Sequence, residues 1–206
     1  MFRKSFILIF GALLAISTAK AQHPDYPFRY MIGFSWDVNV PINNSFVSKT
    51  SLEGFEFDYR HQLKENLTAG FEVSFNGFYQ YVPRQTYHIQ NGAVTTDLYT
   101  YIYTLPMAVN IHHYFDAGKH VKPYAGLAIG ANYSEQKIYY NTYVSQDENW
   151  GFLIRPEIGA IVKPDPHSGF GILLGARYSY ATNKQSTFKI DGLSNLGFQL
   201  GFVFMQ

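Results

Sequence analysis

Apolar and polar residues alternate along most of the chain, and the alternation is cleanest near the C-terminus. From Leu196 to Phe204 every second residue is leucine or phenylalanine, with Gly197, Gln199, Gly201 and Val203 between them. A period of two is that of a β-strand. These nine residues, at about 3.3 Å each and a tilt of roughly 40°, project to a little under ~25 Å, the height of the lipid-facing band of a membrane barrel. The stretch predicts the strand that closes such a barrel.

Seven further stretches alternate in the same way. They are residues 30–40, 53–61, 67–81, 98–113, 121–133, 150–162 and 170–180. Short turns at 62–66, 116–119 and 164–166 alternate with longer connections that begin at Pro41 or span 82–97, 134–149 and 182–192. The even strand number and this rhythm predict an all-β fold, an eight-stranded antiparallel up-and-down transmembrane β-barrel with short periplasmic turns and longer extracellular loops.

Alternation alone does not show which face of the strands points into the barrel. A soluble barrel of the lipocalin kind would bury the apolar face around a ligand. Phenylalanine, tyrosine, leucine and isoleucine from eight strands would overfill so small a lumen, whereas the other face carries glycine, serine, asparagine, threonine and a few charges. We therefore expect the apolar face to contact lipid.

The N-terminus has the pattern of a secretory signal peptide. Arg3 and Lys4 precede an apolar run from Phe6 to Ile16, and Ala19-Lys20-Ala21 offers a small-residue cleavage site. The run is too short to span a bilayer as a helix. We expect residues 1–21 to be cleaved and residues 22–206 to form the outer-membrane barrel domain.

Composition narrows the possible functions. Removal of Arg3, Lys4 and Lys20 changes the formal charge of +1 to −2, and no basic stripe suggests nucleic acid. The chain has no cysteine, which excludes disulfides and thiolate metal sites. We expect no metal and no cofactor.

Several motifs resemble those of a known family. They are Leu105-Pro106-Met107, the run from Lys122 to Leu127, Gly151-Phe152, and the aromatic alternation that ends at Phe204. In these features the mature chain resembles the small bacterial outer-membrane β-barrel-domain family, the relatives of the OmpA and OmpX barrels. The resemblance implies the fold and location in the cell outer membrane. Its motifs carry no chemistry and imply no activity.

The inward-facing positions of the predicted strands carry charged residues. These are Asp37, Glu56, Asp58, Arg60, Glu72, Arg155, Glu157 and Arg177. Hairpins centred on Lys64 and Pro166 would pair Glu56 with Glu72 and Arg155 with Arg177, so like charges need partners elsewhere. We expect a lumenal network in which Glu56, Glu72 and Glu157 neutralise the last two arginines. The alternative is a proton or ion path.

The histidines do not form an enzyme site at the outer leaflet. A lipid A-modifying enzyme would need a histidine with a serine or carboxylate there. His112 and His113 point to opposite faces near the periplasmic end of their strand, and His167 lies in a periplasmic turn. His88 has no adjacent serine. We predict no catalytic residues.

One extracellular connection is rich in aromatic residues. Tyr139, Tyr140, Tyr143 and Trp150 make it the candidate surface-binding loop. The alternative is that these tyrosines only extend the hairpin and bind nothing.

Together these patterns predict a monomeric, non-enzymatic integral outer-membrane protein whose loops bind surface ligands or mediate adhesion and whose body supports the envelope. The alternatives are a narrow pore, a secretion-system subunit or a lipid A-modifying enzyme. The expected partners are outer-membrane lipid and the barrel-insertion machinery, which would recognise Phe198, Leu200, Phe202 and Phe204; no nucleic acid is expected.

Overall fold

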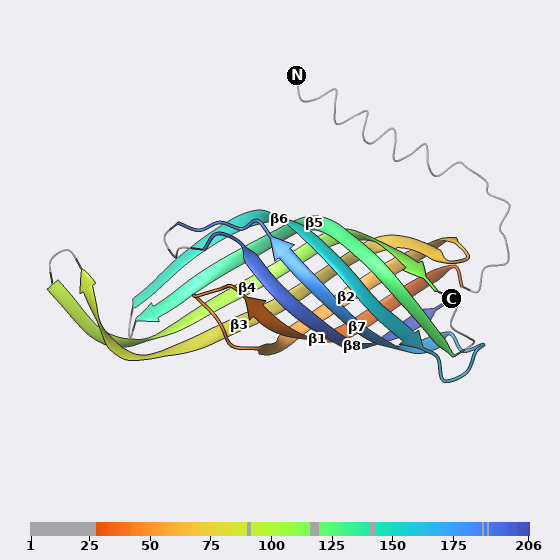
Figure 1. Cartoon of the computed structure of the whole chain (residues 1–206), viewed down its shortest axis with the longest axis horizontal. Helices are drawn as coiled ribbons and strands as arrows, with labels where there is room; N and C mark the ends of the chain where they lie inside the picture. Colours follow the sequence, from red (N-terminus) through yellow and green to blue (C-terminus); the bar gives the residue numbers. More distant parts are fainter. Residues whose placement is uncertain (1–27, 90–91, 116–119, 141–142, 187, 189) are drawn as a thin grey trace, which may run out of the picture.

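The computed structural model describes residues 28–206 apart from 90–91, 116–119, 141–142, 187 and 189. Eight strands form one closed ring in which sequence neighbours pair antiparallel and the last strand pairs with the first (Figure 1). The strands are β1 (Tyr30–Ile42), β2 (Ser51–Lys64), β3 (Leu67–Ile89), β4 (Gly92–Tyr114), β5 (Val121–Tyr140), β6 (Tyr143–Val162), β7 (Phe170–Ala181) and β8 (Leu193–Met205). The up-and-down barrel topology is the predicted one. The predicted signal peptide lies outside the described residues.

No helix among the described residues is long and apolar enough to cross a membrane.

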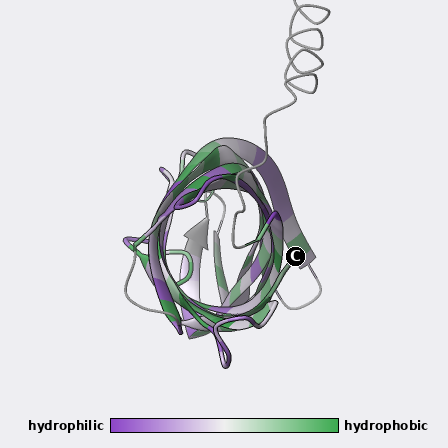
Figure 2. Cartoon of the chain, turned by 90° about the vertical axis from the view of Figure 1, so that its right-hand side faces the viewer, coloured by the Kyte–Doolittle hydropathy of each residue, from purple (hydrophilic) through white to green (hydrophobic). Residues whose placement is uncertain are grey.

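The strands are strongly tilted. A path that starts at Phe152 on β6 and steps from each residue to its partner on the next strand passes through all the other strands in turn. It returns to β6 at Val162, ten residues further along. This displacement over eight strands corresponds to a tilt of roughly 40°. Viewed from its end, the ring is closed (Figure 2).

The apolar face of the strands points outward. Val109 and Ile158, in the periplasmic halves of β4 and β6, are 61% and 65% exposed, whereas the alternate positions are buried in the lumen. Only lipid accommodates such a continuous apolar belt. The soluble, inverted arrangement is therefore excluded.

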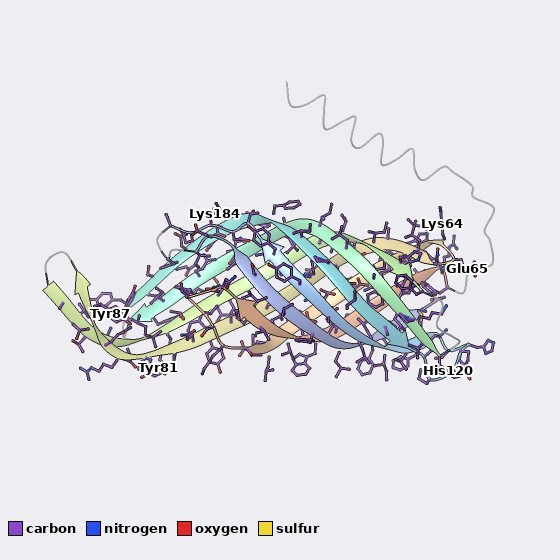
Figure 3. The ribbon with its side chains drawn as sticks, in the orientation of Figure 1. Lys64, Glu65, Tyr81, Tyr87, His120 and Lys184 are labelled. Carbon is purple, nitrogen blue, oxygen red and sulfur yellow. The ribbon has the colours of Figure 1, made fainter. Side chains whose placement is uncertain are left out.

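Four strands continue well beyond the belt. β3 to β6 have 20 to 23 residues each, against 12 to 14 in the others. The connections predicted at 82–97 and 134–149 are therefore wrong, because these segments pair as strands up to Ile89↔Gly92 and Tyr140↔Tyr143. Their content of tyrosine, threonine and valine favours strands, and the turn signal at Pro83 produces only a register shift between Val82 and Gln85. Figure 3 shows Tyr81 and Tyr87 on this extension, at the opposite end from Lys64 and His120.

The other two extracellular connections fold over the mouth of the barrel. Their side chains join strand residues in an apolar cluster, the extracellular cap, which comprises Phe46, Val47, Phe78, Ile102, Ala108, Ala128, Leu153, Ala181, Ile190 and Leu193. A second apolar cluster, the periplasmic cap, comprises Phe28, Met31, Tyr114, Tyr124, Ile161, Leu173, Val203 and Met205. The polar interior lies between the two caps.

Candidate functional site

All eight charged residues that the sequence placed in the lumen lie there, and each is at most 4% exposed. They form two groups of ion pairs, which the side-chain amide of Asn110 connects. We refer to these eight residues as the lumenal network.

The first group lies around two arginines on β6 and β7. Arg177 Nη2 lies 2.5 Å from Asp37 Oδ2, and Nη1 of the same side chain contacts Glu56. Arg155 Nη1 lies 2.8 Å from Glu72 Oε1 and 3.1 Å from Glu56 Oε2. Glu56 therefore joins both arginines, and this group links β1, β2 and β3 to β6 and β7 across the lumen.

The second group lies closer to the periplasmic cap. Arg60 Nε lies 2.7 Å from Asp58 Oδ1, and its Nη2 lies 3.5 Å from Glu157 Oε1. His112 Nε2 contacts the same Glu157 oxygen. The Arg60 guanidinium also lies 4.9 Å from the ring centroid of Tyr124 in the periplasmic cap.

Two amides complete the network. Asn110 Nδ2 donates to Asp58 Oδ2 at 2.9 Å and to Glu72 Oε2 at 3.1 Å, which connects the two groups. Gln199 Nε2 donates to Glu56 Oε1 at 2.9 Å. Side-chain hydrogen bonds thus support the ion pairs, as buried charges require.

The pairing partners differ from those predicted. Arg177 is opposite Glu157 on the neighbouring strand, not opposite Arg155, and Glu56 is opposite Ser74, not Glu72. Each predicted hairpin centre lies one residue too early, which moves the partner by two positions but leaves the face unchanged. The expectation that Glu157 neutralises the arginines of the first group is also wrong, because its partners are Arg60 and His112.

His112 is a lumenal residue that was not among the predicted ones. Its spacing of two from Asn110 on the same strand gives it the inward face, so the alternation of the strand could have identified it. Its ring is fully buried beside Glu157. The side chain of His88, the other candidate, lies outside what the structure describes.

The lumenal network has more acids than bases. It holds five carboxylates and three guanidiniums, so with every group ionised it has an excess of two negative charges. A positively charged His112 would reduce the excess to one. Because arginines are the scarcer members, replacing one should lower the stability of the barrel more than replacing a carboxylate.

Three acids of the network lie close enough to hold a metal ion. The nearest oxygens of Glu56, Asp58 and Glu72 all lie within 4.8 Å of one another. Each of these carboxylates already contacts an arginine. The geometry favours ion pairing over metal coordination.

The four aromatic residues of the predicted surface loop lie on the strand extension. Tyr140 and Tyr143 form the last pair of β5 and β6, and Tyr143 is 77% exposed. Trp150 is 61% exposed on the outward face and packs on Tyr133, with ring centroids 5.3 Å apart. These residues thus lie on paired strands, not in a loop.

Tyr139 belongs to a larger aromatic surface. The pairing of β4 with β5 puts it opposite Tyr99, and on the outward side of the extension its ring lies 5.4 Å from that of Tyr101, its diagonal neighbour. We define the tyrosine face as Tyr79, Tyr81, Tyr99, Tyr101, Tyr103 and Tyr139. The first five lie within the alternating stretches 67–81 and 98–113, but their union with Tyr139 depends on a register that the sequence does not show.

Comparisons with known proteins show similarity in structure only. No protein-family model and no curated protein sequence matches the chain. Neisserial surface protein A is 14% identical, with 87% of this chain and 97% of that chain covered and a TM-score of 0.52. The outer membrane protease OmpT from Escherichia coli is 9% identical, with 74% and 63% covered and a TM-score of 0.50. Ail, the attachment invasion locus protein of Yersinia pestis, is 16% identical, with 85% and 95% covered and a TM-score of 0.46.

At these identities the similarity defines the fold and not the activity. The ring of eight strands and the exposed apolar belt agree with it. The chain therefore has the fold of the small outer-membrane β-barrels and resides in the outer membrane.

Proposed function

We propose that the protein is a non-enzymatic outer-membrane barrel whose closed body supports the envelope and whose strand extension binds ligands at the cell surface. The observation that carries the proposal is the contrast between the two parts. The lumen is filled and capped at both ends, whereas the extension exposes a broad aromatic surface.

The filled lumen argues against a pore or a secretion channel. An ion would have to pass the extracellular cap, the paired charges of the lumenal network and the periplasmic cap in turn. Eight-stranded barrels have an interior just wide enough for side chains to fill it.

The same enclosure argues against catalysis by the histidine and carboxylate that the lumen brings together. The side chains of His112 and Glu157 are at most 1% exposed. Both lie beneath the caps, out of reach of a lipid or peptide substrate. Buried histidines paired with acids commonly have a structural role, and we assign one to this pair.

The proposal predicts that the protein does not conduct ions across a membrane. In planar lipid bilayers the refolded barrel should produce no stable conductance steps, because no continuous water path crosses the lumen. A variant with Phe46 and Val47 both replaced by glycine, which thins the extracellular cap, should remain silent because the lumenal network still blocks the path. A stable open state of the wild-type protein would instead support the pore.

Assembly into the membrane is part of the proposal. The outward row Phe198, Leu200, Phe202 and Phe204 on β8 is suited to recognition by the barrel-insertion machinery. Within the lipid-facing belt the closed ring leaves no open strand edge for a second copy, so we propose that the protein acts as a monomer; only above the belt do β3, beyond Gly77, and β6, before Leu153, have unpaired edges. Cleavage of residues 1–21 stays a prediction.

A further inference from the structure

The tyrosine face continues upward from the lipid-facing belt without a break. Phe75 stacks on Tyr103, with centroids 6.1 Å apart, and Tyr103 stacks on Tyr101 at the same separation. Tyr101 then contacts Tyr79 at 6.3 Å and Tyr139 at 5.4 Å. The molecules beside this face are therefore the upper parts of the lipids that surround the belt.

The face is taller than a phospholipid headgroup layer. Tyr103 and Tyr99 lie four residues apart on β4, which at ~3.3 Å per residue and a tilt of roughly 40° gives a height of roughly 10 Å. The headgroup region of an ordinary bilayer is about 5 to 8 Å thick on each side. The upper rings would stand in water beside phospholipid, whereas a lipid with a sugar headgroup would cover them.

The chemistry of the face also suits a sugar. The outer rings of Tyr79, Tyr81, Tyr99 and Tyr139 are 38% to 44% exposed, so each offers an apolar surface and a hydroxyl. A sugar ring has the complementary combination of C–H surface and hydroxyl groups, and rigid tyrosines bind at a low cost in conformational entropy.

Two lysines add positive charge to this surface. Lys49 Nζ lies 5.5 Å from the ring centroid of Tyr79, and Lys137 Nζ lies 5.7 Å from that of Tyr103. Glu135 holds the second lysine through a 3.0 Å ion pair and raises its pKa. Both lysines are thus placed on the aromatic surface, where a phosphate on a bound sugar would find a cation.

We propose that the tyrosine face, with Lys49 and Lys137, binds the phosphorylated sugar headgroup of an outer-leaflet glycolipid. This inference rests on the proposed surface-binding function and specifies its ligand. The ligand is a membrane component beside the barrel and not a soluble molecule above it.

The test compares lipid binding by the full mature chain and two variants in detergent micelles, measured by titration calorimetry. The probes are lipopolysaccharide truncated after its core sugars, the same lipid after phosphatase treatment, and phosphatidylglycerol. The tyrosine variant carries Tyr81→Thr, Tyr99→Thr, Tyr101→Thr and Tyr139→Thr, since threonine keeps the strand propensity. The control variant carries Tyr143→Thr and Val144→Thr at the tip of the extension. The migration shift of the folded barrel on gels shows that each variant folds.

The expected result is at least a tenfold loss of lipopolysaccharide affinity in the tyrosine variant and none in the control variant. Lys49→Gln with Lys137→Gln should weaken binding of the phosphorylated lipid and leave that of the dephosphorylated lipid unchanged. Equal affinity of the wild type and the tyrosine variant would overturn the proposal, as would equal binding of phosphatidylglycerol. Binding of a delipidated core oligosaccharide at the hairpin tip alone would also overturn it, yet would leave the proposed surface-binding function standing.

Discussion

Replacing Arg177 with leucine is expected to lower the free energy of unfolding by about 3 to 5 kcal/mol, the usual cost of removing one partner of a buried ion pair. The substitution leaves Asp37 without its ion-pair partner and Glu56 with Arg155 alone. It also raises the excess of carboxylates in the lumenal network from two to three. Urea unfolding of the barrel in phospholipid vesicles, followed by the fluorescence of Trp36 and Trp150, measures the change.

The matched control removes a charge of the other sign. Asp58→Asn reduces the excess of carboxylates and keeps an oxygen that can accept from Arg60. It removes the hydrogen bond from Asn110, which still donates to Glu72, so the loss should be about 1 kcal/mol. If both variants unfold like the wild type, the lumenal network does not support the barrel. If the aspartate variant is the less stable one, the charge argument is wrong.

Val109→Arg is expected to lower stability in vesicles by about 2 to 4 kcal/mol, because it puts a charge on the lipid face near the bilayer midplane. Val109 points outward from the periplasmic half of β4 and pairs with Phe71 and Ile129, both within the belt. The same vesicle unfolding assay measures this effect.

Val144→Arg is the corresponding control. This valine is 52% exposed, but it lies on β6 next to the hairpin tip, above the lipid. The same charge there should change stability little, since water solvates it. Equal costs at the two positions would contradict the assignment of the belt to the membrane.

The sequence predicted the strands, the faces and the lumenal residues because a period of two follows directly from strand geometry. It did not predict cross-strand register, because a shift of one residue in the centre of a turn moves every partner by two positions. The pairing of Glu157 with Arg60 and His112 depends on that register and on contacts across the lumen.

Besides the register, the sequence did not show how far the strands extend. The prediction of a connection over 82–97 is wrong because the sheet accommodates Pro83 with a register shift between Val82 and Gln85 and then continues. The predicted connection 134–149 is also paired strand, and its acids Asp147 and Glu148 lie on β6 above the lipid, where water solvates their charges. Polar composition outside a membrane therefore does not distinguish a loop from an extended hairpin.

The most direct test of the barrel and its orientation uses the absence of cysteine from the chain. A single cysteine is placed at Tyr143, on the strand extension, or at His167, in the exposed turn between β6 and β7 at the other end of the barrel, and intact cells are treated with a membrane-impermeant maleimide. The account predicts labelling at 143 and, until the outer membrane is permeabilised, none at 167. Labelling of intact cells at 167 but not at 143 would reverse the orientation, and a protein recovered in soluble form from the periplasm would contradict the membrane barrel itself.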